Sequence, residues 1–121
     1  MTVSMVIFGK PISSTNSKVQ AVAHGRAFSH KSAAFKKYAA DFIAQIPTKY
    51  RNLNIGSMRK PLRCVMTVYF QKWQGDLETK GIYDLLQAAG VIKNDLYVIE
   101  QHHYRAIDKV DPRCEIVVEE I

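Results

Sequence analysis

Residues 73–95 read WQGDLETKGIYDLLQAAGVIKND, and the rest of the chain is arranged around this stretch. Asp76, Lys80 and Asp84 are spaced four apart, so on a helix they would lie above one another on one face. The leucines and alanines around them supply apolar material for packing. Gly90 predicts the end of this helix, because glycine readily takes the left-handed conformation that closes a helix.

The acidic residues of this stretch predict a site for a cation. Asp95 follows Gly90 by five residues, close enough for the chain to return its carboxylate beside Asp76. Carboxylates drawn from two elements are what a hard divalent cation needs, and the neighbouring Lys80 suits a phosphate group. A plainer interpretation is also open, because acidic residues favour the start of any helix and Lys80 with Asp84 suits an ordinary surface pair.

The segments after and before this stretch have the patterns of strands. Residues 62–71, LRCVMTVYFQ, are apolar at both alternating sets of positions, so we expect a central strand buried on two faces. After Asp95, LYVIEQHHYRAI predicts a strand, DKVDPR a turn and CEIVVEEI a last strand. His102 and His103 would then point to opposite faces of their strand, one exposed and one partly buried.

The first half of the chain predicts a strand, a loop and a helix. Residues 2–8 alternate as a strand entering the core. Residues 9–31 are rich in Gly, Pro, Ser, Thr and Asn and predict a long loop, with a short extended piece near residues 26–29. A loop of this length in a compact domain is usually functional. An equally open interpretation is a mobile surface loop that happens to be basic. Apolar residues recur at helical spacing over residues 32–46, and Pro47 ends that helix.

These elements predict an α/β or α+β fold. A chain of 121 residues is long enough for one core and too short for two comfortable ones, so we expect a single domain spanning residues 1–121. The order of elements predicts a small mixed sheet of about four strands with two helices packed on one face.

The charges are divided unevenly along the chain. Residues 1–60 carry ten Lys and Arg and one acid, a net charge of +9, whereas residues 61–121 carry seven Lys and Arg and ten acids, a net charge of −3. A basic half joined to an acidic half indicates a surface for a polyanion beside a site that collects cations. A basic isoelectric point is also common in small proteins and then reflects only solubility.

Composition narrows the cellular setting. No apolar run approaches the roughly 20 residues of a membrane span, and the N-terminus lacks a signal-peptide pattern, so we expect a cytoplasmic protein without a membrane partner. Cys64 and Cys114 lack the spacing of metal ligands, and we expect both to be reduced strand residues.

The residues from Asp84 to Asp95 resemble the core of the RusA family of Holliday-junction resolvases, which reads approximately D-x-D-N-x-x-K-x-x-x-D-A-L, a short turn and then D-D. The interval from Asp84 to Asp95 fits without a gap, and Lys80 precedes Asp84 by four residues as the family's lysine does. The match covers residues 62–121, and the first half adds Gly9-Lys10-Pro11 and an F-x-x-Y pair at Phe35 and Tyr38.

The resemblance implies a small homodimeric DNA endonuclease that depends on Mg²⁺, with Mn²⁺ able to substitute, and that uses no organic cofactor. Members of the family cut branched DNA such as four-way junctions at symmetric positions, in recombination and repair. The implied setting is a bacterial host or a phage or prophage.

Carried over residue by residue, Asp95 matches the family's last essential aspartate, Lys80 its lysine, and Asp76 one member of its D-x-D pair. Two registers are open for the remaining ligand. Without a gap, Gln74 takes the place of the first aspartate, which would replace a carboxylate by a neutral amide. With a two-residue deletion, Asp76 and Glu78 form the pair as D-x-E.

The resemblance assigns roles to these residues. Asp76, Glu78 and Asp95 would hold the metal, and Lys80 would stabilise the phosphate under attack, so these four are the predicted catalytic set. Asp84 would fix Lys80 from one helical turn away. Cationic side chains and one amide elsewhere in the chain are predicted to bind the DNA backbone: Lys10, Asn16, Lys18, Arg26, Lys31 and Arg105.

Two other classes of function remain open on the sequence. A non-catalytic relative that binds branched DNA but has lost a metal ligand is favoured by the register with Gln74. A structural or protein-interaction module would show no salt-sensitive binding to DNA.

Overall fold

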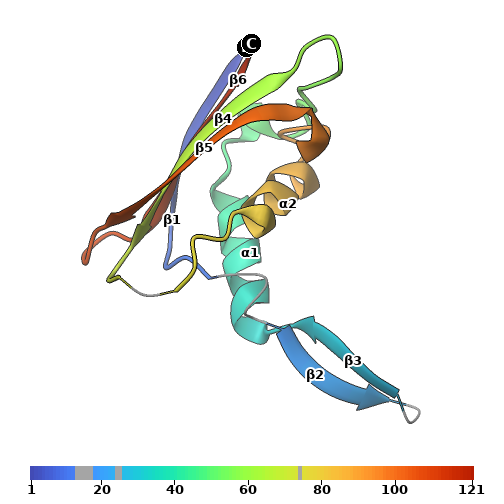
Figure 1. Ribbon diagram of the computed structural model, residues 1–121, viewed down its shortest axis with the longest axis vertical. Coiled ribbons are helices and arrows are strands. Elements are labelled where there is room, and N and C mark those ends of the chain that lie inside the picture. Colours follow the sequence, from blue (N-terminus) through green and yellow to red (C-terminus); the bar gives the residue numbers. More distant parts are fainter. Residues whose placement is uncertain (13–17, 24–25, 74) are drawn as a thin grey trace.

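The computed structural model describes the chain except for residues 13–17, 24–25 and 74, and for residues 18–23 and 26–31 the description is of the backbone (Figure 1). Its main sheet has four strands in the order β1-β6-β4-β5. Strands β4 and β5 are parallel, whereas β6 is antiparallel to both β1 and β4. The bounds of these strands are Thr2–Phe8 for β1, Leu62–Phe70 for β4, Val98–Ile107 for β5 and Arg113–Glu120 for β6.

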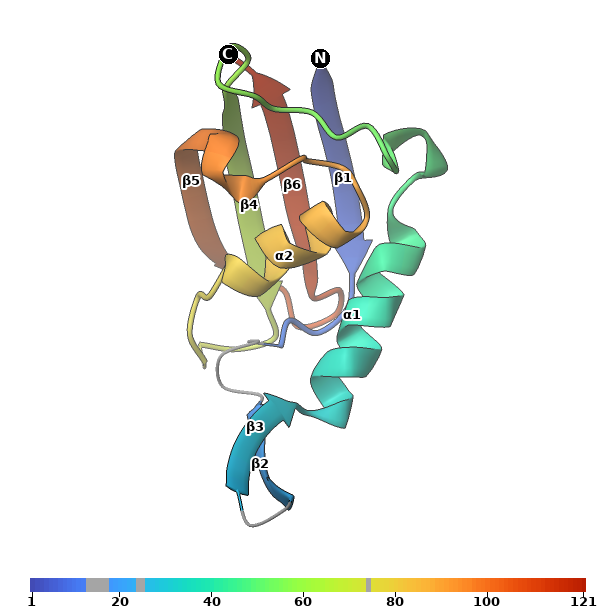
Figure 2. The same ribbon diagram turned by 90° about the vertical axis from the view of Figure 1, so that its right-hand side faces the viewer.

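Two α-helices cover one face of this sheet (Figures 1 and 2). Helix α1 spans Ala33–Gln45, and the Ser32 side chain accepts a hydrogen bond from the Phe35 backbone N–H to cap its start. Helix α2, Lys80–Ala88, connects β4 to the parallel strand β5 and so completes a β-α-β unit. Two short 3-10 helices, η1 at Thr48–Tyr50 and η2 at Asp95–Tyr97, lie in the connections.

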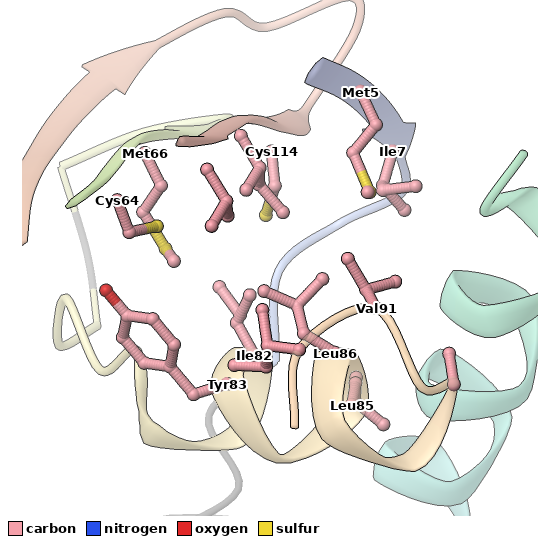
Figure 3. Packing of buried hydrophobic residues seen from close by; sticks show 14 of the residues in the cluster. Met5, Ile7, Cys64, Met66, Ile82, Tyr83, Leu85, Leu86, Val91 and Cys114 are labelled. Carbon is pink, nitrogen blue, oxygen red and sulfur yellow. The ribbon is translucent and has the colours of Figure 1, made fainter. Parts of the chain in front are cut away.

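The core lies between the helices and the sheet. Figure 3 shows Cys64 and Met66 of β4 and Cys114 of β6 pointing toward Ile82 and Leu86 of α2. Strands β1, β4 and β6 each alternate between buried residues on the helix side and less buried residues on the other side. This alternation is expected of a sheet that packs on one face and meets solvent with the other.

The prediction that residues 62–71 are buried on two faces is wrong, although β4 does lie at the centre of the sheet. Both helices pack on the same face, so alternate residues of β4 face away from them (Figure 2). On this open face Arg63 forms ion pairs with Glu100 of β5 at 2.8 Å and with Glu119 of β6 at 3.1 Å.

The prediction that residues 9–31 form a long loop is also wrong in part. Strand β2, Lys18–Ala23, pairs with the antiparallel strand β3, Arg26–Lys31, and the expected extended piece near residues 26–29 belongs to β3. This second sheet projects from the end of the molecule at which α1 begins (Figures 1 and 2).

The architecture is a single small α+β domain with a mixed four-stranded sheet and two α-helices, which confirms the predicted fold class. In the described residues, no helix combines the length and the apolar character that a membrane crossing requires.

Candidate metal and DNA site

The connection between β4 and α2 carries the predicted acidic pair. Asp76 and Glu78 follow the carboxyl end of β4, and α2 begins after them at Lys80. Ligands of open α/β sheets bind outside the carboxyl ends of parallel strands, so the pair occupies a suitable position. The expectation that Asp76 shares a helix face with Lys80 and Asp84 is wrong, because Asp76 lies outside the helix.

Asp76 and Glu78 line the same small cavity, of about 20 Å³, between β4, α1 and the start of α2. A space of this size is comparable to what one water molecule needs. Glu78 also caps α2, since its Oε1 accepts a hydrogen bond from the Gly81 backbone N–H at 3.1 Å. Two of the three predicted carboxylates are therefore suited, by position and by chemistry, to a hard cation.

Asp95 lies on a different part of the fold. It begins η2, immediately before the amino end of β5, whereas Asp76 follows the carboxyl end of β4. Because β4 and β5 are parallel, these ends belong to opposite edges of the sheet. The Asp95 backbone N–H donates to Gln87 Oε1 of α2 at 2.7 Å.

Asp95 is linked electrostatically to α2. Burial is the largest of the influences that raise the pKa of the Tyr83 hydroxyl, followed by Cys64 and by the negative charge of Asp95. Within residues 1–12, 32–73 and 75–121, however, no group of three or more His, Cys, Asp or Glu side chains is placed to hold a metal ion. The expectation that the chain returns the Asp95 carboxylate beside Asp76 is therefore wrong. Whether Asp95 is needed for function stays a prediction.

Lys80 and Asp84 lie on the exposed side of α2. Lys80 is the first residue of the helix and Asp84 lies one turn later, and both side chains are exposed. Lys80 is therefore free of the core and close in sequence to Glu78. A role for Asp84 in orienting Lys80 stays a prediction.

Strand β5 contributes a polar cluster that the sequence did not reveal. His103 Nε2 and the Tyr83 hydroxyl are 2.7 Å apart, and His103 Nδ1 and Thr79 Oγ1 are 3.3 Å apart. Burial, and then the charge of His102, lower the pKa of His103. His102 is exposed and contacts Glu100 on the open face, which confirms the predicted opposite orientations of the two histidines.

Arg105, predicted to bind DNA, contacts the same connection. Its Nη2 donates to the Gly75 backbone carbonyl at 2.6 Å, and its guanidinium carbon lies 4.8 Å from the centre of the Phe70 ring. Gly75 has a φ of +78°, a conformation that residues other than glycine adopt at a cost.

The other predicted DNA-binding residues lie in the first half of the chain. Lys10 is exposed at the end of β1. Lys18, Arg26 and Lys31 belong to strands β2 and β3, where Lys18 pairs with Lys31 in the register. Asn16, like the competing metal-ligand candidate Gln74, lies outside the described residues.

A larger cavity of about 530 Å³ opens beside Lys10. Lys37 of α1 also lines it, together with the acidic side chain of Asp41 and a mostly apolar wall. This cavity and the small one at Asp76 and Glu78 share two lining residues, Ile12 and Tyr38. The lysines and the carboxylates therefore lie on either side of a common wall.

The two cysteines lie in the core and contact tyrosines of the site, Cys64 with Tyr83 and Cys114 with Tyr38. Both are free and buried, Cys64 on β4 and Cys114 on β6, as the sequence predicts. Burial raises the pKa of the Cys114 thiol to about 11, and the contact with the Tyr38 hydroxyl at 3.6 Å opposes that shift. Thiols of this kind are inert structural side chains.

Comparison of the chain with models of known protein families and with curated proteins finds no match. The likeness to the RusA family accordingly rests on the spacing of Asp76, Lys80, Asp84 and Asp95.

Proposed function

We propose that the protein is a Mg²⁺-dependent endonuclease that cuts branched DNA, such as four-way junctions, by symmetric hydrolysis of phosphodiester bonds. The observation that carries the proposal is that Asp76 and Glu78 line one cavity beyond the carboxyl end of β4. Lys80 follows Glu78 by two residues, at the start of α2. Two carboxylates at one cavity, with a lysine on the same short segment of chain, suit a metal ion and a phosphate.

In this proposal each side chain has a separate task. Asp76 and Glu78 would hold the ion, and Asp95 is the third predicted carboxylate. A bound Mg²⁺ supplies charge neutralisation at the phosphate and acidifies a bound water. Lys80, at an exposed position two residues after Glu78, would stabilise the negative charge that grows on the phosphate during attack.

The cavity beside Lys10 and Lys37 supports a path for the DNA backbone. Its volume of about 530 Å³ lies within the range of pockets that hold small organic groups, and its two lysines outnumber the single acid Asp41. Because it shares a wall with the carboxylate cavity, a strand gripped by these lysines would run toward Asp76 and Glu78. Homodimerisation would provide a second, symmetry-related cut.

A non-catalytic protein that binds branched DNA is the second candidate. The spacing from Lys80 to Asp95 matches the family without a gap, and this register places Gln74 at a position that the family fills with aspartate. An amide is a weaker ligand for Mg²⁺ than a carboxylate. Under this alternative the protein binds junctions and leaves them intact.

Cleavage of a labelled four-way junction, with and without Mg²⁺ or Mn²⁺, tests the proposal. We expect metal-dependent cutting by the wild type, lost in Asp76→Asn and Glu78→Gln and retained in Gln74→Ala. Asp95→Asn tests whether the third predicted carboxylate, which lies before the amino end of β5, is needed for cutting. Salt-sensitive binding without cutting would support the second candidate, and absence of DNA binding at low salt would refute both.

A further inference from the structure

Strand β5 contacts the acidic connection at both of its ends. Arg105 binds the carbonyl of Gly75, the residue immediately before Asp76. His103 contacts the hydroxyl of Thr79, the residue immediately after Glu78. The two β5 residues are two positions apart on one strand, so they belong to the same face, the face on which α2 packs.

The contact from Arg105 is suited to holding a backbone in place. Its Nη2 lies 2.6 Å from the Gly75 oxygen, and the guanidinium also lies over the Phe70 ring at the end of β4. A planar guanidinium with rigid donors loses little freedom when both of these contacts form. The left-handed backbone of Gly75 is thereby tied to β5 just before the first carboxylate.

The contact from His103 uses both ring nitrogens. Nδ1 meets Thr79 at the start of α2, and Nε2 meets the Tyr83 hydroxyl one turn further along. The Thr79 side chain makes no capping hydrogen bond to its own helix, and Glu78 caps the helix instead. The hydroxyl of Thr79 is therefore directed to His103, which joins the first turn of α2 to β5.

We propose that His103 and Arg105 are positioning residues that fix Asp76 and Glu78 in a geometry ready to bind a cation. This inference rests on the proposed function, and the physical reason is entropic. An untied connection would have to be ordered when the ion binds, which costs free energy for each residue that is fixed. Outer contacts of this kind typically contribute about 10- to 100-fold in metal affinity or activity.

The chain supplies a matched control. His102 precedes His103 on β5 but faces the open side of the sheet, where its Nε2 lies 3.0 Å from Glu100. His102→Ala removes the same kind of side chain from the same strand without touching the connection. Comparison of His102→Ala with His103→Ala therefore separates positioning of the acidic segment from a general effect on β5.

Hydrogen exchange in metal-free protein tests the positioning itself. We expect faster exchange of the amides in residues 75–80 in His103→Ala and in Arg105→Ala, and wild-type exchange in His102→Ala. His103→Gln, which can keep one of the two contacts, should lie between wild type and His103→Ala. Unchanged exchange of residues 75–80 in both His103→Ala and Arg105→Ala overturns the proposal, whatever the activity of the protein.

Binding of Mn²⁺, followed by quenching of Trp73 fluorescence, tests the consequence for the site. Trp73 is the only tryptophan of the chain, is 74% exposed and lies three residues before Asp76. We expect Mn²⁺ affinity to fall about 10- to 100-fold in His103→Ala and to be unchanged in His102→Ala. Wild-type affinity in His103→Ala would overturn the positioning role, whereas a wild type that binds no Mn²⁺ would overturn the proposed function and leave the exchange experiment to judge the contacts.

Discussion

Replacement of Gly90 by alanine should destabilise the protein more than the same replacement of Gly75. Both glycines have a left-handed backbone, with φ of +71° at Gly90 and +78° at Gly75. This conformation costs alanine about 1–2 kcal/mol at either position, and replacing glycine lowers the conformational entropy of the unfolded chain equally at both. These common contributions cancel in the comparison.

The surroundings of the two glycines differ. A Cβ atom at Gly90 would lie 2.9 Å from Asn52 Cα and 3.0 Å from Asn52 N, whereas at Gly75 nothing lies within 4 Å. The segments around Asn52 and Gly90 cannot move apart easily, because two backbone hydrogen bonds join them. The Asn54 N–H donates to the Gly90 carbonyl at 2.8 Å, and the Asn52 N–H donates to the Ala89 carbonyl at 3.2 Å. Overpacking of this kind costs about 1–3 kcal/mol.

Thermal unfolding of the two variants measures this difference. With an unfolding entropy of about 2.1 cal/mol/K per residue over 121 residues, each kcal/mol lowers Tm by about 4 °C. Gly90→Ala should therefore melt about 4–12 °C below Gly75→Ala. Because Asn52 has a φ of +62°, Asn52→Gly is measured as a background of its own. Gly90→Ala should cost nearly as much in that background as in the wild type, since two of the three contacts at Gly90 are with the backbone of Asn52. Equal melting temperatures for Gly90→Ala and Gly75→Ala would refute the steric reasoning.

Four further outcomes are expected. Lys37→Ala should weaken junction binding and reduce the salt dependence by about one unit of slope, in a filter-binding assay, while Lys36→Ala, outside the cavity, should change it less. Phe42→Ala should lower the free energy of unfolding in urea by about 3–5 kcal/mol, because Phe42 is 1% exposed. Cys114 should resist alkylation at pH 8 until denaturant is added, because burial raises its pKa to about 11. Burial lowers the pKa of His103 below its unfolded value of about 6.5, so its contribution to stability is complete above that pH and is lost as the pH falls. Between pH 7 and 5 the Tm of His103→Gln should therefore fall less than the Tm of the wild type.

Elements with a strong hydrophobic period could be predicted from the sequence. Strand β1 has the predicted bounds. Helix α1 is one residue shorter than predicted at each end, and β4 is one residue shorter at its carboxyl end. In each of them one face is buried and the other is not, so the pattern in the sequence follows directly from the layer that each element joins.

Elements without a strong hydrophobic period could not be predicted as well. Strands β2 and β3 are rich in alanine and polar residues, so local propensity indicates a loop. One signal was available, because only His24 and Gly25 separate the two strands, a spacing typical of hairpins. Burial of β4 on both faces was overestimated because the apolar composition does not reveal on which side the helices pack.

The candidate site was predictable only in part. The spacing of Asp76, Glu78 and Lys80 identified the segment, but the start of α2 depends on capping by Glu78, which excludes Asp76 from the helix. The contacts of His103 and Arg105 join residues more than twenty positions apart. No local pattern in a single sequence encodes such contacts, and they became visible only once β5 was placed beside β4.

If the proposed function holds, the distribution of charge favours one side of the molecule for contact with DNA. The sequence suggested an acidic half that collects cations, but much of that acidity lies on the open face of the sheet, where Arg63 and Arg113 form ion pairs with carboxylates of neighbouring strands and turns. Both arginines are already paired with carboxylates, so neither offers an unpaired positive charge to a polyanion on the open face. Lys37 and the Asp76–Glu78 pair lie instead on the helix side, around the shared wall of the two cavities. Under the proposed function, a DNA strand bound by the lysines would lie close to the carboxylates. A charge reversal such as Lys37→Glu should then weaken DNA binding, whereas Arg63→Glu should affect folding instead.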